Sequence, residues 1–228
     1  MQSIQNYIQR RADEMASHAL FGYLGDRQID AAIRFKFAAR STHFILTYSD
    51  ILRFLLSDES TTDEYQRIVN THCAEERAHA KWFLMDLKTL GQDPEHLFTD
   101  SVNVLWGDDT IKTRLLGYRL SRLSMDLKSI DRVVLLEAIE AMSALAFKAS
   151  APAATELEQR TGKALLFFGQ RHLDSELNHQ LAEESVHEKL ASVKFDGAAR
   201  DRLIAVVDQV LTAFAEYFDE VYSLTTRP

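Results

Sequence analysis

Two short clusters of histidine and carboxylate residues lie far apart in this sequence. The first is the tetrapeptide Glu76–His79, and the second contains His172, Glu176 and His179. Because residues three or four positions apart lie on one face of a helix, each cluster can direct imidazole nitrogens and carboxylate oxygens toward one point. Helices that converge in this way, with a further acid, can form a pocket for one or two transition-metal ions.

The second cluster is the denser of the two. His172, Glu176 and His179 stand at positions i, i+4 and i+7, which form one stripe of a helix. Neutral histidine nitrogens and an anionic carboxylate are donors that suit Fe, Mn or Zn. A lone His–Glu pair is more often an ordinary solvated or core pair, but three donors on one stripe make a metal site an equal interpretation.

The first cluster resembles the Glu-x-x-His pair that carboxylate-bridged metal proteins place on bundle helices. Glu76 stands three residues before His79 and fits this pair better, whereas Glu75, four residues before, is the alternative. The ordinary explanation is an exposed charged face. His72 shares a helical face with His79, so it is a candidate for a group that supports the ligands.

A third acidic position lies in an apolar run, where Glu137 and Glu140 stand among leucine, isoleucine, methionine and phenylalanine. A carboxylate is costly to bury there unless it is paired or binds an ion. We expect Glu140 to point inward, because the alanines and the serine that follow it leave room for a substrate. Glu137 is the alternate.

Helical spacing of apolar residues predicts the elements that position these groups. Glycine (8) and proline (3) are scarce, which favours long helices with few loops. We expect one domain over residues 1–228, an all-α bundle of about seven helices, with a bend or restart at Pro152. The predicted helices cover residues 2–17, from Asp26 or Asp30 to about 56, and about 63–90, 110–127, 132–150, 164–191 and 197–223, with a short turn near 102–106.

Composition narrows the function classes. The net charge of −8, without a basic patch, argues against a nucleic-acid partner. A single cysteine, Cys73, excludes an internal disulfide framework and suits a reducing compartment. No apolar run is long enough to span a bilayer, and the first residues lack the order of a signal peptide. We therefore expect a cytoplasmic protein without membrane contact.

On these residues the chain resembles the haem-oxygenase-like diiron oxidases, a family of non-haem iron enzymes on the scaffold of haem oxygenase and TenA. The family's third-helix signature is His-x3-(Asp or Glu)-x2-His, its first core helix carries a carboxylate and a histidine, and its second carries one carboxylate. The segment 18–24, followed by Gln28-Ile-Asp, is also similar to the family's N-terminal segment. The matching residues are Glu76, His79, Glu140, His172, Glu176 and His179.

The resemblance implies a haem-oxygenase-like bundle, and it implies these six residues as ligands to Fe(II)/Fe(III), with two ions expected and Mn as the alternative. Three carboxylates and three histidines would neutralise much of the charge of two Fe(II) ions and leave positions open for O2 and substrate. The implied activity is oxidation of a small organic molecule at a C–H, C–C or C–N bond. A homodimer is also implied.

Three other interpretations stay open. A TenA-like hydrolase would use Cys73 as nucleophile, although an inert buried cysteine is commoner. A haem-binding oxygenase would use His18 as axial ligand. A helical partner-binding or metal-storage protein would present an apolar stripe of the last helix as a dimer face, although such a stripe is more often core. That stripe consists of Leu211, Phe214, Tyr217, Phe218, Val221 and Tyr222.

Overall fold

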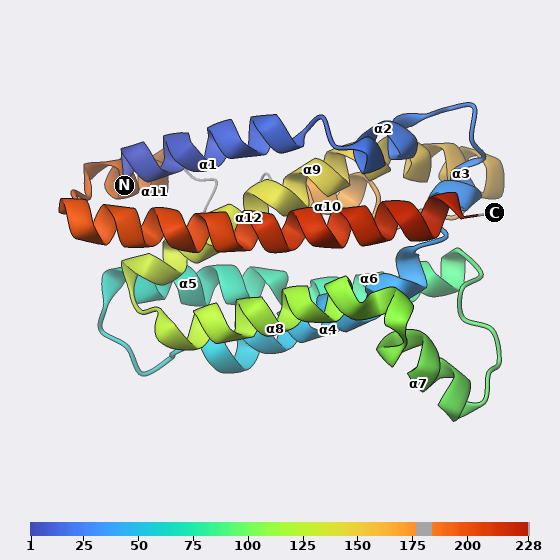
Figure 1. Ribbon diagram of the computed structural model, residues 1–228, viewed down its shortest axis with the longest axis horizontal. Coiled ribbons are helices and arrows are strands. Elements are labelled where there is room, and N and C mark those ends of the chain that lie inside the picture. Colours follow the sequence, from blue (N-terminus) through green and yellow to red (C-terminus); the bar gives the residue numbers. More distant parts are fainter. Residues whose placement is uncertain (177–183, 228) are drawn as a thin grey trace.

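The computed structural model describes residues 1–176 and 184–227, and every regular element in these ranges is helical. The predicted all-α multi-helical bundle is confirmed, with more and shorter helices than expected. Figure 1 shows α12 running along the whole molecule, with α1 on one side and α4, α5 and α8 on the other. The α-helices are α1 (Gln2–Met15), α2 (Ala19–Gly25), α3 (Ala31–Arg34), α4 (Thr42–Asp50), α5 (Glu64–Glu75), α6 (His79–Thr89), α7 (Phe98–Trp106), α8 (Ile111–Asp126), α9 (Ile130–Thr161), α10 (Gln170–Glu176), α11 (Glu184–Ser192) and α12 (Gly197–Thr226).

Side-chain caps start several of these helices. Asp30 accepts a hydrogen bond from the Ala32 N–H at the start of α3, and Asp63 accepts from the backbone N–H groups of the first turn of α5. Asp196 does the same for α12. Each carboxylate satisfies N–H groups that have no partner inside the helix and faces the positive end of the helix dipole.

Several boundaries differ from the sequence prediction. The helix expected from Asp26 or Asp30 to about 56 is divided into α3, a 3-10 turn η1 (Ala38–Ser41), α4 and a π-helix η2 (Ile51–Leu56). The helix expected over 63–90 is interrupted by a 3-10 turn, η3 (Glu76–Ala78), between α5 and α6. α9 continues through Pro152 to Thr161 as one helix and does not restart there. The helix expected from 164 begins as α10 at Gln170, and residues 163–169 form a loop.

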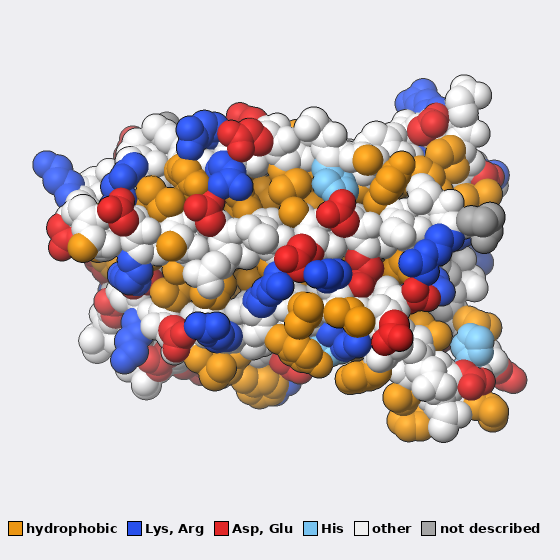
Figure 2. Space-filling view, in the orientation of Figure 1, with side chains coloured by type: hydrophobic (Ala, Val, Ile, Leu, Met, Phe, Trp, Pro, Cys, Tyr) orange, Lys and Arg blue, Asp and Glu red, His pale blue; other side chains and the backbone are white. Residues whose placement is uncertain are grey.

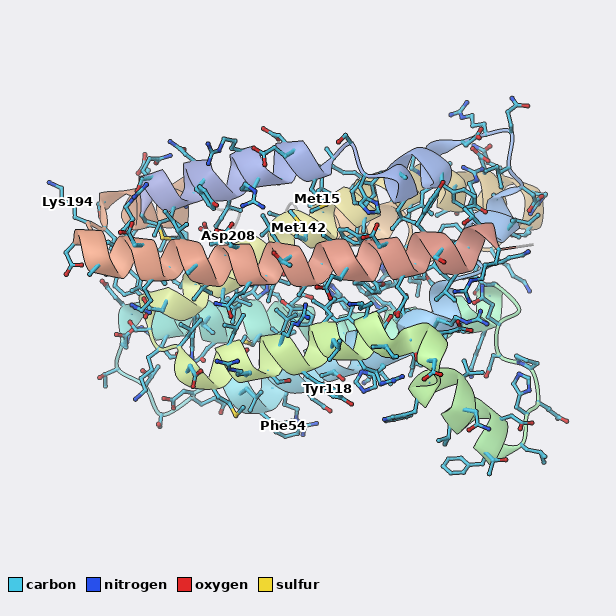
Figure 3. All side chains as sticks on the ribbon, viewed as in Figure 1. Met15, Phe54, Tyr118, Met142, Lys194 and Asp208 are labelled. Carbon is cyan, nitrogen blue, oxygen red and sulfur yellow. The ribbon has the colours of Figure 1, made fainter. Side chains whose placement is uncertain are left out.

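The core lies between α9, α12 and the surrounding helices. α1 is fastened to α12 by Asp208, which accepts a hydrogen bond of 2.7 Å from the Tyr7 hydroxyl and also contacts Arg11; Figure 3 labels Asp208. Most of the apolar stripe of the last helix is buried, since Phe214 is 2% and Phe218 1% exposed. This stripe is therefore core and not a dimer face, and a homodimer through another surface stays a prediction.

Helix α7 differs from the other helices because none of its residues is buried. Phe98 is 82% exposed and Trp106 53% exposed. In Figure 2 hydrophobic side chains gather at the lower right of the molecule, where Figure 1 places α7. None of the described helices combines the length and the apolar character that a bilayer span requires.

Candidate metal centre

Glu76 and His79 are brought together by the 3-10 turn at their position. Side chains three residues apart eclipse in a 3-10 helix, so the turn stacks the carboxylate directly on the imidazole. The Glu76 Oε2 atom lies 2.6 Å from His79 Nδ1. Both side chains are buried, at 7% and 4% exposure of the two residues. The interruption of the predicted helix therefore falls at the first cluster and tightens it.

His172 reaches the same point from the first turn of α10. Its Nδ1 atom lies 2.8 Å from the backbone carbonyl oxygen of Phe167. A carbonyl oxygen only accepts, so Nδ1 carries the proton and donates it, and Nε2 is the nitrogen with a lone pair for an ion. The His172 ring lies against His79, with 4.1 Å between centroids, and against Phe147, with 4.0 Å.

Glu76, His79 and His172 each offer one donor atom, and these atoms lie within 4.8 Å of one another. All three residues are buried. A carboxylate with two imidazoles in an apolar setting is the donor set of non-haem iron oxygenases and of many zinc enzymes. A buried carboxylate is costly without a positive partner, and a divalent cation supplies one. The donor set therefore fits a resident metal ion.

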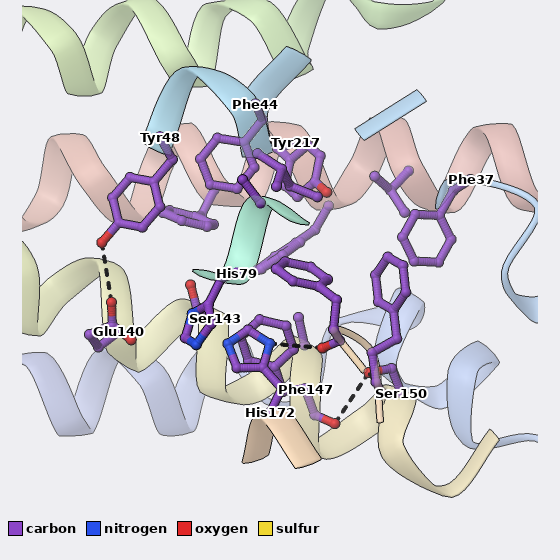
Figure 4. Close-up of a pocket in the computed structure, with 18 of the residues that line it drawn as sticks. Phe37, Phe44, Tyr48, His79, Glu140, Ser143, Phe147, Ser150, His172 and Tyr217 are labelled. Carbon is purple, nitrogen blue, oxygen red and sulfur yellow. Dashed lines mark hydrogen bonds between the residues drawn. The ribbon is translucent and has the colours of Figure 1, made fainter. Parts of the chain in front are cut away.

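Glu140 lies in the same cavity but does not belong to this described group. It accepts a hydrogen bond of 3.2 Å from the Tyr48 hydroxyl, and its Oε1 atom lies 3.3 Å from His72 Nε2. Figure 4 shows Tyr48 and Glu140 to one side of the neighbouring rings of His79 and His172. His72, the proposed supporting group, thus meets Glu140 and is itself 1% exposed.

The two alternate residues, Glu137 and Glu75, are not part of the described donor group. Glu137 faces α1, where Gln5 Nε2 donates to its Oε1 atom over 2.9 Å. Burial raises the pKa of Glu137 to about 7, against opposing effects of Gln5 and the N-terminal amine. Of the two neighbouring acids in the first cluster, Glu76 and not Glu75 joins the described group. Glu76 and Glu140 line the cavity, whereas Glu75 and Glu137 are not among its described lining residues.

Two predicted ligands cannot be placed. His179 lies outside the described residues, and Glu176 ends α10 with a side chain that is also outside them. The described part of the second cluster is therefore His172 alone.

The donors border a largely apolar cavity of about 90 Å³. This volume exceeds the roughly 10–15 Å³ that one water needs. Ser143 and Ala146 leave open space beside the donors, as the small residues after Glu140 predict. The apolar wall comes from α2, Phe37, α4, Leu52, α9, the loop 163–169 and α12. The lining includes Leu20, Leu24, Phe37, Phe44, Ile45, Phe147, Phe167, Phe168, Phe214, Phe218 and Val221.

Residues singled out for the rival functions lie elsewhere. Cys73 is not among the described residues that line the cavity, and burial raises the pKa of its thiol to about 11. His18 also stands outside the described lining; its Nδ1 caps α2 at Leu20 N, and its Nε2 lies 3.2 Å from Asp219.

Sequence reasoning missed Asp86. This residue is fully buried, and its carboxylate accepts three backbone N–H groups from Leu166, Phe167 and Phe168, at 2.7, 2.9 and 3.0 Å. Burial raises the pKa of Asp86, and the three N–H groups act in the opposite direction. An acid within an apolar run, the same signal that marked Glu140, was present in residues 82–87.

Comparison with known proteins adds no assignment: neither a protein-family model nor a curated protein matches the chain.

Proposed function

We propose that this chain is a metal-dependent oxidoreductase of the non-haem iron type, which uses O2 to oxidise a small and largely apolar organic molecule. The observation that carries the proposal is the convergence of Glu76, His79 and His172 at the edge of an apolar cavity. Bound Fe(II) would supply the electrons that O2 needs, a chemistry that none of the protein's own side chains provides. Manganese is the alternative metal.

The residues of the chain have distinct parts in this proposal. Glu76, His79 and His172 would hold the ion, with His172 Nε2 available because Nδ1 donates to the Phe167 carbonyl. Among the described residues, Glu140 would be a carboxylate ligand of a second ion, and its hydrogen bond with Tyr48 fixes its orientation. His72 lies within 3.3 Å of Glu140 and is placed to support it.

The cavity wall favours an apolar substrate. Its phenylalanine and aliphatic side chains offer few hydrogen-bond partners for a polar molecule, and they exclude water from the donors. Exclusion of water protects reactive oxygen species from stray protons. The polar groups of the wall, among them Ser143 and Ser150, can orient one polar end of the substrate, and a bound metal ion would supply the oxidation chemistry at its C–H, C–C or C–N bond.

The test is metal binding followed by turnover. Metal-free protein is loaded with Fe(II) without oxygen, freed of excess iron and analysed for its elements. We expect iron at one or two ions per chain in the wild type and a loss of at least tenfold in iron affinity in His172→Ala, since the variant lacks one of three ligands. Substrate-dependent O2 uptake then separates catalysis from storage.

The matched control is His18→Ala, because His18 lies outside the described cavity lining. This variant should hold as much iron as the wild type. Added hemin should give no strong Soret band that depends on His18. Only trace iron in the reconstituted wild type, or equal iron in His172→Ala, would refute the proposal.

A further inference from the structure

The loop 163–169 has no regular structure, and it lies shortly before the candidate ligand His172. Most of its residues from Leu165 onward are buried. Leu165 is 2%, Phe167 8% and Phe168 5% exposed. Backbone N–H groups at such depth need partners, because water is not there to supply them. A loop of this kind keeps one shape only if another part of the molecule satisfies its backbone.

Asp86 supplies those partners from α6. Its Oδ1 atom accepts from Leu166 N at 2.7 Å, and its Oδ2 atom accepts from Phe167 N at 2.9 Å and Phe168 N at 3.0 Å. A carboxylate can accept several N–H bonds at once, and charge-assisted bonds of this type are stronger than neutral ones. Three consecutive residues of the loop are therefore fixed to a single side chain.

The fixed loop holds His172. The N–H group of Phe167 donates to Asp86, and the carbonyl oxygen of Phe167 accepts from His172 Nδ1 at 2.8 Å. A shift of Phe167 would thus turn the imidazole or free it to change tautomer. On its other side, the loop is held by Ser150, whose hydroxyl donates to the Phe168 carbonyl over 3.0 Å. Figure 4 shows His172 and Ser150 with these two hydrogen bonds.

α6 carries both a ligand and this anchor. Asp86 follows His79 by seven residues, or about two helical turns, so both side chains lie on one face of α6. His79 belongs to the donor group directly, while Asp86 reaches the donor group through the loop. One rigid helix thereby sets the separation of two histidines that are distant in the sequence.

We infer that Asp86 is a positioning residue of the metal centre, which fixes the Phe167 carbonyl and through it the orientation and the Nδ1–H tautomer of His172. It touches neither the ion nor the substrate. The inference rests on the proposed function only for its effect on metal affinity, because the tautomer of His172 is a property of the metal-free protein.

Asp86→Asn tests the inference, since an amide keeps the shape but places an NH2 group against a backbone N–H. Histidine nitrogens labelled with 15N report the tautomer by NMR in metal-free protein, with His172→Gln to assign the signals. We expect the wild type to hold the Nδ1–H form and the variant to show a mixture. Co(II) affinity, measured by absorbance, should fall by about 10–100-fold, as is usual when a group behind a ligand is lost.

Leu120→Ala is the control for lost stability, because Leu120 is fully buried in α8 and is not among the described cavity residues. It should leave the tautomer and the Co(II) affinity unchanged. Gly169→Ala is the second variant, since a Cβ there would lie 2.1 Å from the Leu165 carbonyl oxygen and displace the loop without altering Asp86. It should reproduce the mixed tautomer.

If Asp86→Asn or Gly169→Ala folds and His172 keeps its wild-type tautomer in that variant, the inference is overturned. The inference is also overturned if Leu120→Ala shows the same mixture of tautomers. If neither loop variant folds, Asp86→Glu decides: a carboxylate restores the acceptor, so His172 should keep Nδ1–H, and a mixed tautomer would overturn the inference. Absence of Co(II) binding in the wild type would remove the proposed function and leave the tautomer result valid.

Discussion

Glu137 gives the protein a predictable dependence of stability on pH. Burial holds the pKa of its carboxyl at about 7 in the folded state, against an ordinary value of 4.5. Between these two values the folded protein binds more protons than the unfolded chain, so the free energy of unfolding falls as pH rises through this window. Below the window the full stability is present, and above it the loss is complete.

The two pKa values set the size of the effect. Each pH unit between them corresponds to about 1.4 kcal/mol, so the loss over the interval from 4.5 to about 7 is at most about 3.5 kcal/mol. Gln5 donates to the carboxylate, and the N-terminal amine lies near enough to lower the pKa of Glu137. The pKa of about 7 already includes both of these opposing effects.

Glu137→Gln isolates this contribution. The variant is neutral at every pH and keeps an oxygen that can accept from Gln5. Urea unfolding of both proteins across about pH 4.5–8 should give similar free energies at the acidic end, with the variant increasingly more stable than the wild type toward the basic end. A difference between the two proteins that is constant with pH would refute the reasoning.

Three further predictions concern residues outside the donor group. Cys73→Ser should leave iron content and O2 uptake unchanged, and the native thiol should react slowly with alkylating reagents at neutral pH, because its pKa lies near 11; fast alkylation would contradict this. Leu120→Ala should lower the unfolding free energy by about 2–5 kcal/mol, whereas Phe54→Ala, at a residue 64% exposed, should change it by less than about 1 kcal/mol. Tyr217→Phe should lower the free energy of unfolding by about 1 kcal/mol, because it loses the 2.8 Å hydrogen bond to Ser41. In the wild type, Tyr217 should ionise only near pH 12 in an ultraviolet titration. A titration in which all tyrosines ionise near pH 10 would contradict this.

The helical architecture could be predicted because its signals are local. Apolar spacing, scarce glycine and proline, and capping aspartates act within a few residues, and Asp30, Asp63 and Asp196 each cap a helix. The continuation of α9 through Pro152 was not predictable from the same rules. A buried helix can tolerate the missing N–H when packing on both sides holds it, and the residues beside Pro152, Ala151 and Ala153, are buried.

The candidate site could be predicted only in part, since its donors come from separate helices. The pair of Glu76 and His79 is readable from spacing, and the 3-10 turn brings it closer than an α-helix would. The loop before His172 was predicted as helix, because residues 164–168 are good helix formers. Their backbone N–H groups instead bond to Asp86, about eighty residues earlier, a long-range partner that no local pattern shows.

The donor residues come before α12 in the sequence, so during synthesis they emerge before the helix that completes the cavity wall. Glu76, His79 and His172 precede α12, yet Phe214, Phe218 and Val221 of that helix complete the wall around them. While α12 is still inside the ribosome, the growing polypeptide can assemble its nitrogen and oxygen donors in open water, where a hydrated cation enters easily. Docking of α12 then completes the cavity wall, so an ion at the proposed site would enter before the donors lose contact with water.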